Sequence, residues 1–170
     1  MKRNGAKNIQ PIMISACLIG VNCRYDGIPA PWNSLLEWLL LSGEHIPFIP
    51  FCPEQMGGLP TPRPPAFLIS GDGNHVLQGM ATVKDDSGKD QTASFIKGAE
   101  QAFHVALIAG CATAIMKDKS PSCSLSTARY KTETGYSFGP GVTAAMLMSK
   151  GIKIIETGKD SSFNPDILRQ

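Results

Sequence analysis

Short apolar runs recur along the chain and alternate with longer stretches of helical pattern. Runs of this length, bounded by turn residues, are typical of strands that a sheet buries on both faces. The predicted strands are residues 11–16, 46–51, 112–116 and 152–156. Because a helical pattern separates each strand from the next, we expect helices to cover both faces of a mainly parallel sheet.

Glycines mark the ends of the stretches with helical pattern, as they do at the C-termini of many helices. The predicted helices are residues 34–43, 92–109 and 141–150. Asn33 precedes the first of them and suits its N-cap. Together with the strands, these helices predict an α/β fold of three layers, a Rossmann-like arrangement around one mainly parallel sheet.

Two segments interrupt this alternation. GGLPTPRPPAFLIS, residues 57–70, holds four prolines, which disfavour a helix and a central strand and predict an extended, rigid loop. Residues 74–89 carry turn signals and predict a small antiparallel excursion. We expect a single domain over residues 11–158, preceded by a flexible N-terminus at 1–10 and followed by a C-terminal tail at 159–170.

The composition is that of a soluble globular protein, with 42% hydrophobic and 18% charged residues. The formal net charge of +2 is too small to predict a long nucleic-acid partner. No stretch approaches the length of about eighteen apolar residues that spans a membrane, and no apolar segment follows the basic start of the chain. We therefore expect a cytoplasmic protein that binds neither membranes nor long nucleic acids.

The chain has five cysteines, Cys17, Cys23, Cys52, Cys111 and Cys123. An odd number without an export signal disfavours disulfides and leaves buried fillers, reactive thiols or metal ligands. Cys17 and Cys52 close predicted strands, and Cys123 lies in the loop after a third. Because the C-terminal ends of parallel strands share one edge of a sheet, we expect these three thiols to converge there.

The type of metal follows from the donor atoms and their spacing. Thiolate ligands select zinc, copper(I) or iron–sulfur clusters. Structural zinc sites commonly contain closely spaced ligand pairs, whereas the nearest cysteines here, Cys17 and Cys23, have five residues between them. The histidines have no partner at ligand spacing either. Thiolates on separate loops therefore fit an iron–sulfur cluster better than a zinc ion.

Five sequence blocks carry a resemblance to a known family. In order, they are ISACLIGVNCRYDG, FCPEQMGGLPTPRPP, ASFIKGAEQA, IMKDKSPSC and GPGVTAAML. The chain resembles the bacterial thiouracil desulfidase family, long catalogued as domain of unknown function five hundred twenty-three, from Ile14 to Ile155. The resemblance implies a 4Fe-4S (four-iron, four-sulfur) cluster with three cysteine ligands and one open iron, which would accept the sulfur of a thiolated pyrimidine.

The resemblance assigns the cluster ligands residue by residue. Cys17 in SACL, Cys52 in FCPE and Cys123 in SPSC match ligand positions. Cys23 in VNCRYDG is also a motif position, and it either replaces one of these ligands or lies beside the cluster. Cys111 lies outside every block and is expected to be a buried filler.

The same resemblance implies a catalytic glutamate and a catalytic lysine. Glu54 is the carboxylate of the second block and would activate the attacking water. Its alternative role is to bind the backbone of its own loop. IMKDKSPSC contains two lysines, and Lys117, which ends a predicted strand, is favoured over Lys119 for proton transfer or charge stabilisation.

Other motif residues have one functional and one structural interpretation. Arg63, on its proline-rich scaffold, either contacts substrate or is an exposed structural arginine. Ser120 and Ser122 either donate hydrogen bonds to cluster sulfides or shape the turn around a proline. The segment after Cys123 departs from the family pattern, with Ser124 in place of a glycine, and this leaves the identity of the substrate open.

These features predict an enzyme that removes sulfur from thiouracil or a related small thiolated nucleobase or nucleoside. The reaction would release hydrosulfide and uracil without net electron transfer, and cluster-assembly machinery would be a further partner. Two alternatives stay open. One is an iron–sulfur electron-transfer or sensor protein, which normally has four cysteine ligands, and the other is a thiol-ligated zinc or nucleotide-binding module.

Overall fold

The computed structural model describes residues 10–43, 45–158 and 162–168. Most of the predicted N-terminal segment, and residues 159–161 and 169–170 of the predicted tail, lie outside these ranges. Within the described ranges, no helix combines the length and the apolar character that crossing a membrane requires.

The four predicted strands form one parallel sheet, sheet A, in the order β2-β1-β5-β8. They are β1 (Ile12–Ser15), β2 (Phe48–Phe51), β5 (Thr113–Lys117) and β8 (Lys153–Thr157). All three strand pairings are parallel, and β1 lies between β2 and β5. The predicted parallel sheet is confirmed, and each strand lies within two residues of its predicted bounds.

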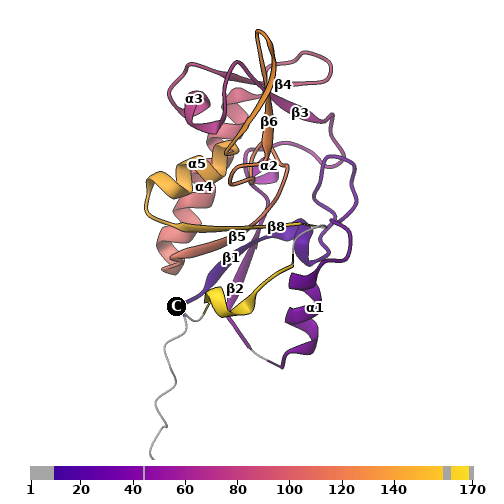
Figure 1. Cartoon of the computed structure of the whole chain (residues 1–170), viewed down its shortest axis with the longest axis vertical. Helices are drawn as coiled ribbons and strands as arrows, with labels where there is room; N and C mark the ends of the chain where they lie inside the picture. The colour runs from indigo at the N-terminus through magenta and orange to yellow at the C-terminus, as the bar shows by residue number, and fades with distance from the viewer. Residues whose placement is uncertain (1–9, 44, 159–161, 169–170) are drawn as a thin grey trace, which may run out of the picture.

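Helices cover both faces of sheet A, so the predicted three layers are also confirmed (Figure 1). Met13 and Met116 face one side, in an apolar cluster with α4 and α5. Ile14 and Ile115 face the other side and pack against α1. The helices are α1 (Ser34–Leu41), α4 (Thr92–Ala109) and α5 (Val142–Ser149). Burial of one side chain of this size contributes about 1.5–3 kcal/mol to the free energy of folding, so these alternating positions hold the layers together.

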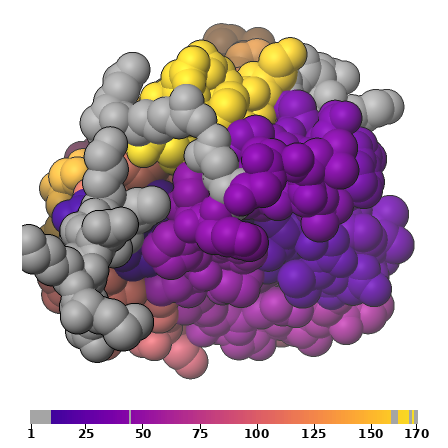
Figure 2. Space-filling model, turned by 90° about the horizontal axis from the view of Figure 1, so that it is seen from below, coloured from indigo at the N-terminus to yellow at the C-terminus, as the bar shows by residue number. Residues whose placement is uncertain are grey.

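Part of the predicted C-terminal tail packs on the α1 side of the sheet. The ring of Phe163 lies 5.4 Å from that of Trp38, and its backbone N–H donates to Ser34 Oγ at 2.7 Å. A short 3₁₀ helix, η2 (Pro165–Leu168), follows. Figure 2 shows the C-terminal residues in yellow against the purple surface of α1.

A second sheet, sheet B, has the order β4-β3-β6-β7. Its strands are β3 (Ala66–Ile69), β4 (Thr82–Asp85), β6 (Ala128–Thr132) and β7 (Gly135–Gly139). β3 pairs antiparallel with β4 and parallel with β6, and β6 and β7 form an antiparallel hairpin. In Figure 1 this sheet lies above sheet A, with α2 between them.

The prediction of a loop throughout residues 57–70 is wrong, because β3 is an inner strand of sheet B. The four prolines all precede Ala66, so the backbone N–H groups of the strand itself are available for pairing. The predicted antiparallel excursion is confirmed in β4, and it also contains a short helix, α3 (Gly73–Leu77).

Two glycines bring α2 (Pro53–Met56) unusually close to α4. A Cβ atom at Gly57 would lie 2.1 Å from the carbonyl oxygen of Ser94, and one at Gly98 would lie 2.0 Å from that of Pro53. Only glycine permits this approach. The contact places the segment that carries Cys52 and Glu54 at the end of sheet A.

Candidate functional site

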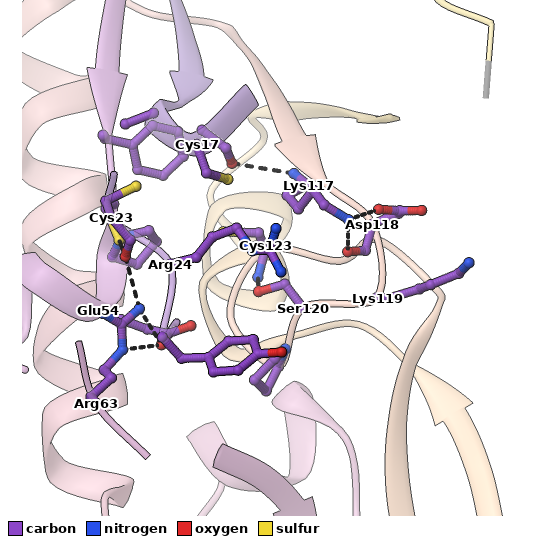
Figure 3. A pocket seen from close by; sticks show the side chains of 17 residues that line it. Cys17, Cys23, Arg24, Glu54, Arg63, Lys117, Asp118, Lys119, Ser120 and Cys123 are labelled. Atoms are coloured by element: carbon purple, nitrogen blue, oxygen red, sulfur yellow. Dashed lines mark hydrogen bonds and ion pairs between the residues drawn. The ribbon is translucent and has the colours of Figure 1, made fainter. Parts of the chain in front are cut away.

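Four of the five cysteines line one cavity, of about 120 Å³, at the C-terminal edge of sheet A. Cys17 lies in the 3₁₀ helix η1 (Ala16–Ile19), directly after β1, and Cys52 directly follows β2. Cys123 lies in the turn after β5, and Cys23 in the loop after η1. Figure 3 shows Cys17, Cys23 and Cys123 around this cavity. The predicted convergence of Cys17, Cys52 and Cys123 at the strand ends is therefore confirmed.

The thiols are buried and close to one another. The exposed fractions of Cys17, Cys23 and Cys123 are 8%, 1% and 6%, and the Cys52 thiol donates to the carbonyl oxygen of Cys23 at 3.6 Å. Cys111 does not line the cavity and packs in the apolar cluster between sheet A and α4 and α5. Its environment is that of a buried filler.

Mutual contact and burial raise the pKa values of Cys23, Cys52 and Cys123, and this favours their protonated form. The adjacent Cys17 side chain and burial raise the pKa of Cys23 to about 11, although Cys52 and Arg63 oppose this rise. Burial raises the pKa of Cys123 to about 12. Contact with Cys23, followed by burial, raises the pKa of Cys52 well above its ordinary value. A bound metal group would have to displace these protons, because metals bind the thiolate.

The donor set fits an iron–sulfur cluster. Thiols from four separate segments surround a cavity, as suits a group that contains several metal atoms. In the described part of the chain, no three histidine, cysteine, aspartate or glutamate side chains form a group that would hold a single metal ion.

Glu54 and Arg63 form a buried ion pair beside the thiols. Arg63 Nε and Nη2 lie 2.8 Å and 2.7 Å from Glu54 Oε2, and the side chains are only 5% (Arg63) and 14% (Glu54) exposed. Arg63 also donates to the carbonyl oxygens of Cys23 at 3.1 Å and Pro60 at 3.0 Å. Arg63 is therefore not an exposed arginine, because it joins α2, the Cys23 loop and the proline-rich segment.

The second oxygen of Glu54 reaches the turn that carries Cys123. Ser122 Oγ donates to Glu54 Oε1 at 3.3 Å. Ser120 Oγ accepts hydrogen bonds from the backbone N–H groups of Ser122 at 3.2 Å and Cys123 at 3.1 Å. Ser120 thus has the turn-shaping contacts of its structural interpretation, while Ser122 links the turn to the carboxylate.

The side chains of the two candidate lysines point in different directions. Lys117 ends β5, and its Nζ binds the carboxylate of Asp118 and the carbonyl oxygen of the same residue, the latter at 3.1 Å. Both lysines line the cavity, but Figure 3 shows the Lys119 side chain extending away from the cysteines. Sequence reasoning did not identify Asp118, although its place between two lysines in KDK is a signal for such a pairing.

The loop after Cys123 is held by a residue that sequence reasoning also missed. Glu156, in β8, accepts hydrogen bonds from the backbone N–H groups of Leu125 at 2.6 Å and Ser126 at 2.9 Å, and from the Thr127 hydroxyl. Ser124 Oγ lies 2.8 Å from Thr127 Oγ1 and 3.4 Å from the same carboxylate. Ser124 therefore takes part in this network.

Comparison with known proteins gives consistent matches. The sequence model of the family described as 2-thiouracil desulfurase matches residues 12–158. The uncharacterized protein YbbK of Bacillus subtilis (strain 168) is 35% identical over 145 residues, which cover 85% of this chain and 93% of YbbK. The solved structure of the 4Fe-4S-dependent thiouracil desulfidase TudS is similar with a TM-score of 0.67 and 37% identity, over 86% of this chain and 90% of TudS.

Proposed function

Because the chain belongs to the 2-thiouracil desulfurase family, we propose that it is a 4Fe-4S-dependent enzyme that removes sulfur from a thiolated pyrimidine. The family resemblance found in the sequence blocks is confirmed. The observation that carries the proposal is the convergence of Cys17, Cys52 and Cys123 with Glu54 around one cavity.

Cys17, Cys52 and Cys123 are the proposed ligands. Each follows a strand of sheet A, so the sheet sets their spacing before any cofactor binds. Cys23 touches both Cys17 and Cys52, and we place it beside the cluster, with replacement of one ligand as the alternative. Held by these three thiolates, such a cluster would supply a Lewis-acidic iron able to accept a soft thiocarbonyl sulfur.

Glu54 is the proposed general base. Two Arg63 nitrogens bind Oε2, and this orients the carboxylate and leaves Oε1 beside Ser122. Oε1 then accepts a proton from the water that attacks the carbon bearing sulfur. A carbon–oxygen bond forms and the carbon–sulfur bond breaks, so that sulfur leaves as hydrosulfide and uracil remains. No electrons are transferred overall.

Lys117 is the proposed cation for the charge that develops on the reacting base. Its pairing with Asp118 and its position at the end of β5 hold the ammonium at the cavity wall. A fixed cation lowers the free energy of a developing anion more than a mobile one, because it needs no reorganisation. Lys117→Met should therefore reduce turnover more than Lys119→Met, as sulfide release from thiouracil measures.

The test of Glu54 separates an enzyme from an electron carrier. After anaerobic reconstitution, Glu54→Gln should retain iron and sulfide and lose about 10²- to 10⁴-fold in turnover, the range for a general base. Glu100→Gln on the exposed side of α4 is the matched control. Full turnover by Glu54→Gln would contradict the assignment.

A second candidate function is that of an electron-transfer protein with four cysteine ligands, because four thiols line the cavity. Cys23→Ser distinguishes the two functions. A desulfidase with the proposed ligands keeps its iron in this variant, whereas an electron carrier with four ligands loses iron or shifts its reduction potential.

A further inference from the structure

The outer face of sheet B alternates aromatic and cationic side chains. The cross-strand pairs on it are Phe67 with Lys84, Arg129 with Phe138, and Lys131 with Tyr136. Phe67, Tyr136 and Phe138 are 43%, 62% and 64% exposed, whereas the intervening residues, such as Leu68 and Val83, are fully buried. Within these four described strands, no outward position carries a carboxylate.

This face opens toward the cysteine site. A second cavity, of about 690 Å³, is lined by Phe67, Arg129 and Phe138 from sheet B. Glu54 and Lys119 line both this cavity and the one that holds the thiols. A ligand on the outer face of sheet B therefore has a path to the carboxylate proposed as the base.

The chemistry of the face matches a single-stranded nucleic acid. Exposed aromatic rings stack on bases without regard to sequence, and cations bind the phosphates between them. The Arg129 guanidinium lies 4.3 Å from the centre of the Tyr136 ring, which holds it in place on the surface. Lys84 has Asp90 nearby, so Arg129 and Lys131 are the stronger phosphate contacts.

The width of the face and the sign of its charge argue against other occupants. Neighbouring strands lie about 4.8 Å apart, so four strands span about 14 Å, more than one nucleotide covers. A second copy of the chain on the same face would oppose Arg129 and Lys131 with identical cations, since a two-fold interface pairs one patch with itself.

We propose that the outer face of sheet B binds a short single-stranded oligonucleotide whose thiolated pyrimidine enters the cysteine-lined cavity. The inference rests on the proposed desulfidase function for the fate of the base. It adds a polymer substrate to the free base considered under the proposed function. The modest net charge does not oppose it, because the outward positions of the four described strands carry Lys84, Arg129 and Lys131 and no carboxylate.

Fluorescence anisotropy with dye-labelled hexauridylate, on the anaerobically reconstituted chain, tests the face. We expect saturable binding at 50 mM salt that weakens as salt rises. Phe138→Ala and Tyr136→Ser should each weaken binding about five- to hundredfold through the loss of one stacked base. Arg129→Gln should reduce the magnitude of the slope of log K against log salt concentration by about 0.7, because one phosphate contact is lost.

Matched controls lie on other surfaces. Phe48→Ala removes an aromatic that is 40% exposed on β2, and Lys150→Gln removes an exposed cation after α5. Both should bind hexauridylate as the unmodified chain does. Melting temperatures confirm that each variant folds, and Tyr136→Ser retains the test if Phe138→Ala does not fold.

Three results would overturn the inference. These are no saturable binding by the unmodified chain, equal weakening in the control variants, and a concentration-dependent dimer in sedimentation that Phe138→Ala dissociates. Sulfide release from free thiouracil is measured in parallel. Release without hexauridylate binding refutes the oligonucleotide face alone. Binding without release, either from free thiouracil or from a hexauridylate that contains one 4-thiouridine, refutes the proposed desulfidase function and leaves the face standing.

Discussion

The close approach of α2 and α4 predicts that one methyl group on α4 disturbs the site. In Gly98→Ala the new Cβ would lie 2.0 Å from the Pro53 carbonyl oxygen, whereas ordinary contacts lie at 3.4–4 Å. The two helices would therefore have to separate by more than 1 Å. Because Cys52 caps α2 and Glu54 lies within it, both residues would move with that helix.

The expected size of the effect follows from overpacking. Extra atoms in a close-packed contact cost about 1–3 kcal/mol. Alanine's better helix propensity returns up to about 1 kcal/mol, so we expect a net loss of about 1–2 kcal/mol in the free energy of unfolding. A displacement of about 1 Å at a reacting group can reduce turnover about 100-fold.

Urea unfolding, iron content after anaerobic reconstitution and sulfide release measure the three consequences. Gln101→Ala, at an exposed position of α4, is the control and should change none of them. If Gly98→Ala unfolds at the same urea concentration, binds iron normally and keeps full turnover, the helix contact does not position the site.

Three further predictions concern residues around the site and sheet B. Arg63→Lys keeps the charge but loses the two guanidinium nitrogens that bind Glu54, so we expect the free energy of unfolding to fall by about 1.5–3 kcal/mol. An unchanged urea midpoint would contradict this. Glu156→Ala leaves the N–H groups of Leu125 and Ser126 without their acceptor and should lower the free energy of unfolding by about 1–3 kcal/mol. The loop after Cys123 should then be cleaved faster by a protease, and an unchanged cleavage rate would refute the anchoring role of Glu156. Hydrogen bonds from Ser87 and Gln91 lower the pKa of Asp85. Its ionised form therefore stabilises the fold above the unfolded pKa of about 3.9, and this contribution is lost as pH falls through the lower folded pKa. The urea midpoints of the unmodified chain and Asp85→Asn should differ at pH 7 and converge below about pH 4, and a constant difference would refute the pKa argument.

Sheet A was predictable because both of its faces are covered. Its strands read as continuous apolar runs, and residues such as Met13 and Ile14 are buried on opposite sides. Sheet B has one open face, so ARYKT and GYSFG place exposed polar or aromatic residues between buried or half-buried ones and contain no apolar run. In β3, the prolines upstream concealed a strand that begins only after the last of them.

The site was predictable where local sequence carries the chemistry. Cysteines at strand ends, and a glutamate two residues after one of them, could be placed before the fold was known. The partners could not, because Arg63 meets Glu54, and Glu156 meets the loop after Cys123, only through tertiary packing. The same limit applies to the aromatic face, whose residues come from separate strands.

Cluster-dependent desulfuration is tested by anaerobic reconstitution, with sulfide release from 2-thiouracil and 4-thiouracil measured on the same sample. We expect about four iron and four sulfide per chain, held by three cysteines, and hydrosulfide released in equal amount to uracil from at least one of the two substrates. A zinc-loaded, iron-free protein, or an intact cluster that releases no sulfide from either thiouracil, would contradict it.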